Sequence, residues 1–369
     1  MIYLDNGATS FHKPQAVFHA VEEAMRSCAN PGRGGYKAAM EASRRLYACR
    51  EAASQLFDCD PQQVVLTNNC THGLNIAIRS LVSPGSHVLV SGFEHNAVVR
   101  PLYALGAKIT VAGRRLFDWE DTLREWEAAL DRGQDVAVFT HVSNVFGYIL
   151  PVEEMARLCL QRGVPFILDA AQSAGTLPVK LRQLGASFIA VPGHKGLLGP
   201  QGTGLLLCSG GAEPLLFGGT GSASIRREMP EDLPERLEAG TVNVPGFAGL
   251  TEGLRYLNRV GTESVFRREH RQLIRCVAGM QKLGLRVFHG PHQAATVSFV
   301  PETDCEEAAE FLAKRQIAVR AGLHCAPVAH ESGGTLDSGT VRISFGFDAS
   351  DAQTEVFLRE ASKLPHKRL

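Results

Sequence analysis

An aspartate and a lysine follow two neighbouring apolar runs in the middle of the chain. The first run, 166–168, ends at Asp169, with Gln172 shortly after it. The second run, 187–191, is followed by Lys195 in a loop rich in glycine. Active sites of open α/β sheets lie at the carboxyl ends of parallel strands, so we expect Asp169 and Lys195 to face one pocket.

A lysine that faces a carboxylate across a pocket is the arrangement that pyridoxal phosphate needs. The lysine holds the cofactor covalently, and the carboxylate keeps the ring nitrogen protonated so that the ring can accept electrons. An aspartate after a strand can equally be a helix cap, and a lysine can equally be a solvated surface residue. These two residues alone leave both interpretations open.

The composition is typical of a soluble enzyme. The chain has 369 residues, of which 44% are hydrophobic and 21% charged, and 38 basic residues balance 38 acidic ones. This length can bury a large core, and one large plus one smaller domain is expected. A balanced charge provides no field to attract nucleic acid or anionic lipid, so we expect no nucleic-acid or membrane partner.

The N-terminal sequence and the cysteines indicate a reducing compartment. The N-terminus has no basic start and no apolar core of signal-peptide length, and no later run reaches transmembrane length, so we expect a cytoplasmic protein. The nine cysteines are scattered, with no C-x-x-C pair. This pattern favours reduced thiols over a disulfide framework or a metal site, and we expect most of the cysteines to be small core residues.

Strands and helices alternate from residue 63 to the central stretch. Strands are predicted over 63–67, 87–91, 108–112 and 136–142, and helices over 71–82, 96–104, 121–130 and 152–162. The alternation predicts an α/β fold with a mostly parallel sheet that has helices on both faces. Thr71 lies at the first strand-to-helix junction, where free N–H groups and the helix dipole suit a phosphate. A simple N-cap role for Thr71 is compatible with this.

The last third of the chain has a different pattern. Helices are predicted over 246–258, 262–283, 304–315 and 351–362, and strands over 285–289, 295–300, 317–320 and 341–345. These elements make an α+β unit of about a hundred residues. We expect a large domain over 14–258, and a small α+β domain formed by 259–369 together with the N-terminal segment 1–13.

Seven short motifs occur in the order found in class V pyridoxal-phosphate enzymes. They are Tyr3–Thr9, Glu94–Asn96, His141–Gly147, Asp169–Gln172, Gly193–Lys195, Glu238–Thr241 and Arg320–Ala326. From end to end, the chain resembles a cysteine desulfurase or selenocysteine lyase of the class V aminotransferase family. The resemblance implies a fold type I pyridoxal-phosphate enzyme, with helices on both sides of the large-domain sheet and a smaller C-terminal α+β domain.

The resemblance also implies which residues bind the cofactor. Lys195 would hold pyridoxal 5'-phosphate covalently, Asp169 would pair with the ring nitrogen, and Gln172 would donate to the ring hydroxyl. His95 would stack on the ring face. The other implied cofactor contacts are Thr71, His72, Asn144, His194 and Thr241. Thr241 would reach in from the neighbouring subunit, which implies a homodimer with shared active sites.

The substrate contacts follow from the same resemblance. Arg342 would bind the carboxylate of L-cysteine or a related amino acid, with Asn144 and Arg320 nearby. Cys325, together with Lys195 and His95, completes the implied catalytic set. His324 and Arg320 would supply positive charge that favours the thiolate of Cys325.

The spacing of the cysteine motif indicates a subclass. Arg342 follows Cys325 by 17 positions (342 minus 325), so the cysteine loop is short, as in desulfurases that resemble selenocysteine lyases. Release of sulfur from such an enzyme can require an acceptor protein. Four positions depart from the common pattern and leave the substrate preference open: Tyr36, His72, Pro192 and Leu323.

Three functions are compatible with these motifs. The first is a cysteine desulfurase that converts L-cysteine to L-alanine and forms a persulfide on Cys325. The second is a selenocysteine lyase, another class V lyase or an aminotransferase, in which Cys325 has no role. The third is a non-catalytic sulfur-transfer scaffold, which the intact Asp169 and Lys195 argue against.

Overall fold

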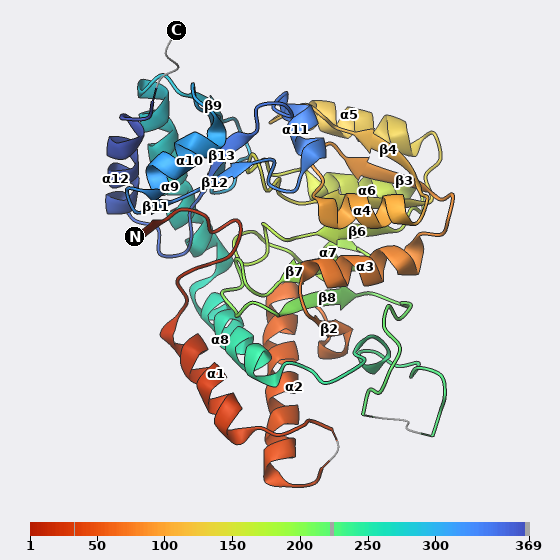
Figure 1. Cartoon of the computed structure of the whole chain (residues 1–369). Helices are drawn as coiled ribbons and strands as arrows, with labels where there is room; N and C mark the ends of the chain where they lie inside the picture. The colour runs from red at the N-terminus through yellow and green to blue at the C-terminus, as the bar shows by residue number, and fades with distance from the viewer. Residues whose placement is uncertain (33, 222–224, 366–369) are drawn as a thin grey trace.

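The computed structural model describes residues 1–32, 34–221 and 225–365, and it is organised around two sheets (Figure 1). The larger sheet has seven strands in the order β2-β8-β7-β6-β5-β3-β4. The smaller sheet has four strands in the order β12-β13-β10-β9. The two sheets lie on opposite sides of the N-terminal segment and the loops that follow β6 and β7.

The seven-stranded sheet alternates with helices as the sequence predicts. Its strands are β2 (Val64–Thr67), β3 (His87–Ser91), β4 (Lys108–Ala112), β5 (Val136–Thr140), β6 (Phe166–Asp169), β7 (Phe188–Pro192) and β8 (Gly204–Cys208). The intervening helices are α3 (Cys70–Leu81), α4 (Asn96–Ala104), α5 (Trp119–Leu130), α6 (Val152–Gln161) and the short α7 (Leu181–Leu184). Within this sheet the pairs among β3, β4, β5, β6 and β7 are parallel, and β8 runs antiparallel to both of its neighbours, β7 and β2, so the mostly parallel sheet is confirmed.

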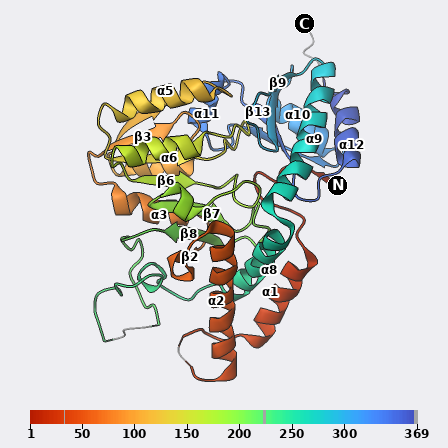
Figure 2. The ribbon, with the colours of Figure 1, turned by 180° about the vertical axis from the view of Figure 1, so that it is seen from behind.

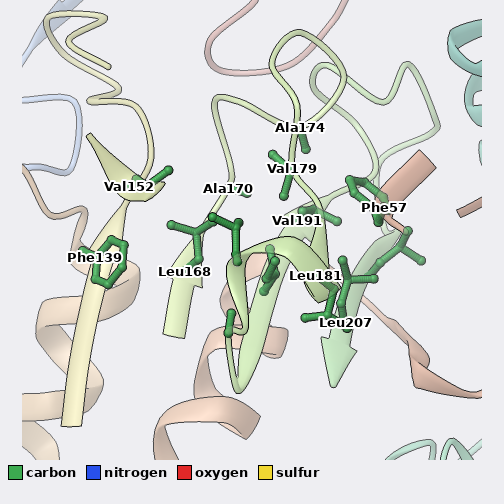
Figure 3. Close-up of a cluster of buried hydrophobic side chains, with 14 of the residues drawn as sticks. Phe57, Phe139, Val152, Leu168, Ala170, Ala174, Val179, Leu181, Val191 and Leu207 are labelled. Atoms are coloured by element: carbon green, nitrogen blue, oxygen red, sulfur yellow. The ribbon is translucent and has the colours of Figure 1, made fainter. Parts of the chain in front are cut away.

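Apolar side chains cover both faces of this sheet. Phe139 and Leu168 point into one core layer, with α2, α5 and α6 (Figure 3). Val138 and Ile167, the residues next to them in sequence, point into the opposite layer, with α3 and α4. Parallel strands buried on both faces need such continuous apolar runs, and only their carboxyl ends are left for polar residues.

The smaller sheet and the N-terminus pack together. The strands of the smaller sheet are β9 (Arg286–Phe288), β10 (Thr296–Val300), β12 (Arg320–Gly322) and β13 (Thr340–Ser344). The helices of this unit are α9 (Thr262–Lys282), α10 (Cys305–Ala313) and α12 (Asp351–Ala361). Strand β1 (Ile2–Tyr3) pairs in parallel with β11 (Ile317–Ala318). Leu4 is buried in the core of this unit. The exact domain limits stay a prediction.

Three further helices lie below the large sheet in Figure 1. Helices α1 (Gln15–Ser27) and α2 (Lys37–Phe57) pack against α8 (Val244–Val260). Helix α9 follows α8 after Gly261 and extends into the smaller unit, as the view from behind also shows (Figure 2). No helix among the described residues is long and apolar enough to cross a membrane. Helix α11 (Pro327–Gly333) was not predicted.

Candidate active site

A cavity of about 220 Å³ lies at the carboxyl ends of β5, β6 and β7. Ten of the twelve residues predicted for the site line it, all except His72 and Thr241: Lys195, Cys325, His95, Asp169, Gln172, Thr71, Asn144, His194, Arg342 and Arg320. They come from both sheets, although they are spread over nearly the whole sequence. The structure therefore assembles one pocket from motifs that the sequence shows only as separate stretches.

Asp169 lies at the end of β6 and is almost fully buried. Its Oδ1 accepts a hydrogen bond from the Ala171 backbone N–H at 2.9 Å and a weaker one from the Cys70 thiol at 3.6 Å. Burial raises the pKa of Asp169, while the Ala171 N–H and Lys195 oppose this shift. The second oxygen makes no hydrogen bond with a described residue, so a cationic partner there would stabilise the carboxylate.

Lys195 is partly buried in the loop that follows β7. Burial is the main cause that lowers the pKa of Lys195, and the positive charges of Arg342 and Arg320 lower it further. Cys70 and Asp169 act in the opposite direction and raise it. Its Nζ makes no hydrogen bond with a described residue. An amine that loses its proton more readily than usual is suited to covalent attachment of a carbonyl cofactor.

The backbone around Lys195 is closely packed. A Cβ atom at Gly196 would lie 2.3 Å from the carbonyl oxygen of Ala174, so only glycine fits. The Gly193 N–H bonds to the Thr203 carbonyl oxygen at 2.8 Å. These contacts fix the direction from which the lysine enters the cavity.

His95 caps the N-terminus of α4 and faces the same cavity. Its Nδ1 accepts a hydrogen bond from the Ala97 N–H at 3.0 Å, so the proton of the neutral ring is assigned to Nε2. Burial lowers the pKa of His95 to about 4, and the positive charges of Lys195, Arg320 and Arg342 add to this. A flat neutral ring held in this way can stack on a planar cofactor.

The N-terminus of α3 provides a place for a phosphate. Asn69 is the N-cap, because its Oδ1 accepts from the His72 N–H at 2.9 Å, so Thr71 is not the cap. The Thr71 hydroxyl makes no hydrogen bond with a described residue and stays available. On the other side, His194 Nδ1 lies 3.1 Å from the Thr9 hydroxyl, and burial lowers the pKa of His194 to about 4. Free N–H groups and hydroxyls at a helix N-terminus suit an anion.

Two of the predicted cofactor residues lie elsewhere. The ring of His72 turns away from the cavity, and its Nδ1 accepts from the Asn68 N–H at 3.3 Å. Thr241 is exposed in the loop before α8 and does not line the cavity of its own chain.

Arg342 lines the cavity from β13 and is buried, with 1% of its surface exposed. It donates from Nη2 to Asp5 Oδ1 at 2.6 Å and from Nη1 to the Asn144 carbonyl oxygen at 3.0 Å. Its buried Nε has no partner among the described residues. Arg320 is exposed and faces the same cavity. A carboxylate that entered here would meet two guanidinium groups.

Cys325 is the one exposed cysteine of the nine. Seven others are buried and Cys28 is intermediate, which confirms the expectation that most are core residues. Cys325 and His324 both have left-handed backbone conformations, with φ of 57° and 50°. The turn is held by bonds from the Asn96 N–H to the Cys325 carbonyl and from Asn144 Nδ2 to the His324 carbonyl, both 2.8 Å.

The expected charge of His324 was wrong. Its ring is buried, and Nε2 lies 3.0 Å from the Thr340 hydroxyl. Burial is the main cause that holds the pKa of His324 far below its usual value, and Arg342 adds to the shift, so the ring is neutral. Positive charge near Cys325 therefore comes from Arg320 and Arg342. Because His324 and Cys325 both have left-handed backbone conformations, their neighbouring positions in the sequence do not indicate where their side chains point.

The groups that face the cavity match pyridoxal phosphate. Asp169, Lys195 and Thr71 line it, and the buried Asn144 Oδ1 has no hydrogen-bond partner among the described residues. A cofactor with a ring nitrogen, an aldehyde and a phosphate would satisfy groups of these kinds. The residues present therefore fit this cofactor.

Some residues of the site were given no role by the sequence. The Cys70 thiol contacts Asp169, and the Gly7 carbonyl oxygen accepts a hydrogen bond from Gln172 Nε2 at 2.9 Å. Asp5 pairs with Arg342. Asp5 and Gly7 belong to the first of the seven motifs, so the resemblance marked this segment without saying what it contacts. Cys70 gave no signal, because its partner is distant in sequence.

The sequence profile of the aminotransferase class V family matches residues 2–357, so the chain belongs to that family. Within it, the chain is 33% identical to a probable cysteine desulfurase of Methanothermobacter thermautotrophicus, over 91% of this chain and 88% of that protein. A probable cysteine desulfurase of Pyrococcus abyssi is 32% identical, over 97% and 92%. The chain is thus a member of the cysteine desulfurase group.

Solved structures agree with this placement. The apo cysteine desulfurase of Thermococcus onnurineus superimposes with a TM-score of 0.89 at 31% identity, covering 98% of this chain and 94% of that one. The Escherichia coli cysteine desulfurase CsdA has a TM-score of 0.84 at 24% identity, with 98% and 94% covered, and supports the fold. The fold is that of the fold type I pyridoxal-phosphate enzymes, as expected.

The buried histidines predict loss of stability in acid. Burial lowers the pKa of His141, which follows β5, to about 4. Between this value and roughly 6.5, the value in the unfolded chain, the unfolded state binds the extra proton, so stability falls as pH falls. We expect His141→Gln to flatten the dependence of the free energy of unfolding on pH by up to about 1.4 kcal/mol per pH unit.

Denaturant unfolding at several pH values between 4 and 7 measures this dependence. The control is His19→Gln, because His19 is exposed on α1. Equal slopes for the His141 variant and the unaltered protein would contradict the assignment of a buried neutral ring.

Proposed function

We propose that this protein is a pyridoxal-phosphate-dependent cysteine desulfurase, which takes sulfur from L-cysteine as a persulfide on Cys325 and releases L-alanine. The observation that carries the proposal is that one cavity is lined by Lys195, Asp169, Arg342 and the exposed Cys325. A lysine and an aspartate serve the cofactor, a guanidinium serves an amino-acid carboxylate, and a reachable thiol serves as acceptor.

Cofactor binding would use the groups that line this cavity. Lys195 would hold the cofactor covalently, Asp169 would pair with its ring nitrogen, His95 would stack on the ring, and Thr71 and His194 would bind the phosphate. Gln172 keeps one amide N–H for the ring hydroxyl after bonding to Gly7. When bound, the cofactor supplies an electron sink for the bonds at the substrate α-carbon.

The chain's own residues then divide the remaining work. Arg342 binds the carboxylate of cysteine and orients the amino acid. Lys195 would accept the proton from the substrate α-carbon. The residue needs a depressed pKa for this role, and its burial provides one.

Cys325 performs the sulfur transfer. Its thiolate attacks the substrate sulfur, a bond forms between the two sulfur atoms, and the bond from the substrate sulfur to Cβ breaks. The electron pair of the broken bond stays with the carbon skeleton, which takes up the proton given up by the Cys325 thiol to form the methyl group of alanine, and Lys195 returns the proton it accepted to the α-carbon. The persulfide keeps the proton of the substrate thiol, so the products balance the reactants.

The proposal includes two protein partners. Thr241 is exposed and outside its own cavity, which is consistent with a place at the phosphate of a second copy in a homodimer. A sulfur-acceptor protein would receive the persulfide. The exposure of Cys325 supports such a transfer.

Lys195 should be the residue that binds the cofactor. Borohydride reduction of the loaded protein, followed by peptide mapping, should place the pyridoxyl group on Lys195, because its amine is buried beside Asp169. Asp169→Asn should keep the cofactor but slow the reaction by at least about a hundredfold, since the ring nitrogen loses its anionic partner. Label on Lys13 or Lys180, or an unchanged rate in Asp169→Asn, would contradict these roles.

Cys325→Ala should separate cofactor binding from sulfur transfer. The variant should bind pyridoxal phosphate and respond spectrally to L-cysteine, but form no persulfide and release no sulfide. Assays of alanine, sulfide and keto acid, with cysteine and with selenocysteine, measure the products. Cys28→Ala is the matched control, because it removes another thiol that is not fully buried.

Two outcomes would overturn the proposal. Sulfide release at the unaltered rate in Cys325→Ala would move the nucleophile elsewhere. Keto acid as the main product would identify an aminotransferase instead.

Hybrid dimers test the shared site. Lys195→Ala and Thr241→Ala proteins should each be impaired, and mixing them should restore part of the activity, because one of the two sites in a hybrid then carries both intact residues. The measurement is activity after subunit exchange, with exchange followed by two distinguishable tags. Exchange without recovery would show that Lys195 and Thr241 act within one chain.

A further inference from the structure

We propose that Asp5 is the positioning residue that holds Arg342 ready for the carboxylate of the substrate. The inference rests on the proposed function, because it assumes an amino-acid substrate. The guanidinium of Arg342 is buried, and it is the least exposed charged group of the cavity wall on the side of the small sheet.

Two hydrogen bonds fix the guanidinium plane. The Asn144 carbonyl oxygen accepts from Nη1 at 3.0 Å and Asp5 Oδ1 accepts from Nη2 at 2.6 Å. With the Asn144 bond alone, the group could turn about that single contact. The pair of bonds leaves three of the five N–H donors without a partner among the described residues, and one of them, Nε, is buried.

The N-terminal segment holds Asp5 in place through Ser344, which lies two positions after Arg342 on β13. The Ser344 carbonyl oxygen accepts from Asn6 N at 3.3 Å and from Asn6 Nδ2 at 3.1 Å. The Gly7 N–H donates to Ser344 Oγ at 2.7 Å. These bonds fix Asp5 relative to Arg342 rather than leaving it as a surface partner.

Gly7 permits this approach. A Cβ atom at Gly7 would lie 3.3 Å from Arg342 Cζ and 3.2 Å from Ser344 Oγ, closer than a side chain usually packs. The same residue accepts from Gln172 through its carbonyl oxygen. The segment thus contacts the substrate arginine and a cofactor residue within a few residues of sequence.

Asp5 could instead compete with the substrate for Arg342, since both are carboxylates. The positioning role is favoured because Asp5 takes only one N–H of Nη2 and leaves the Nε–H free. Arg320 faces the same cavity and offsets the repulsion between the two anions. A hydrogen-bond acceptor, more than a negative charge, is then what position 5 requires.

Paired probes can separate this role from general damage. L-alanine and L-alanine methyl ester both offer an amine to the cofactor of the loaded protein, but only L-alanine offers a carboxylate to Arg342. We expect Asp5→Ala to raise the half-saturating concentration of L-alanine roughly tenfold, because one partner of a buried charged pair is lost. The methyl ester should bind unchanged, and Asp5→Asn, which keeps an acceptor oxygen, should recover most of the affinity.

The control is Asp348→Asn. Asp348 holds the same N-terminal segment through His12 at 2.6 Å but does not contact Arg342, so both probes should bind as in the unaltered protein. The change in cofactor absorbance gives the binding curves. Turnover of L-cysteine should show a raised KM with little change in kcat in Asp5→Ala.

Each alternative result has a defined meaning. Unchanged or tighter binding of L-alanine by Asp5→Ala would overturn the positioning role, and so would an equal loss for both probes. If the unaltered protein binds L-alanine but releases no sulfur from cysteine, the desulfurase proposal fails and the role of Asp5 stands. If the unaltered protein responds to neither probe, both fail.

Discussion

The removal of Lys195 and Asp169 from water is the constraint on which the site depends. Asp169 is buried and Lys195 is partly buried where strand ends of the parallel sheet meet, and the charged form of each would cost free energy there without a partner. Burial shifts both pKa values toward the neutral forms. The same burial that destabilises the ions prepares an amine for covalent chemistry and a carboxyl group for a cationic ring, so the instability of the cavity is part of its function.

The N-terminal segment connects this cavity to the second sheet. Residues 5–10 bond to Arg342 through Asp5, to Gln172 through the Gly7 carbonyl, and to His194 through Thr9 and Ser10. The preceding strand β1 is anchored on β11. A stretch with little regular structure therefore links Arg342, Gln172 and His194, which line one cavity.

The sequence predicted the elements well and the side-chain directions less well. Continuous apolar runs marked β3, β5 and β6 because a strand buried on both faces needs them. Asp169 and Lys195 were found by their positions after such strands. His324 was misjudged, because its positive φ and its bond to Thr340 depend on tertiary contacts. The Asp5–Arg342 pair joins residues 337 apart in sequence, and no local pattern encodes such a contact.

The proposed sulfur transfer places two requirements on the Cys325 thiol, and the turn that carries it meets both. The residue must face the cavity to meet a substrate sulfur, and it must be reachable from outside for the sulfur to leave. The left-handed conformations of His324 and Cys325 cost roughly 1–2 kcal/mol each, and bonds from Asn96 and Asn144 to their carbonyl groups offset that cost. Of the two donors, Asn96 begins α4 next to His95, and Asn144 lies in the loop after β5. The large-sheet side of the cavity therefore positions the thiol. The sulfur can then be passed outward from a fixed turn, without an excursion of a long loop.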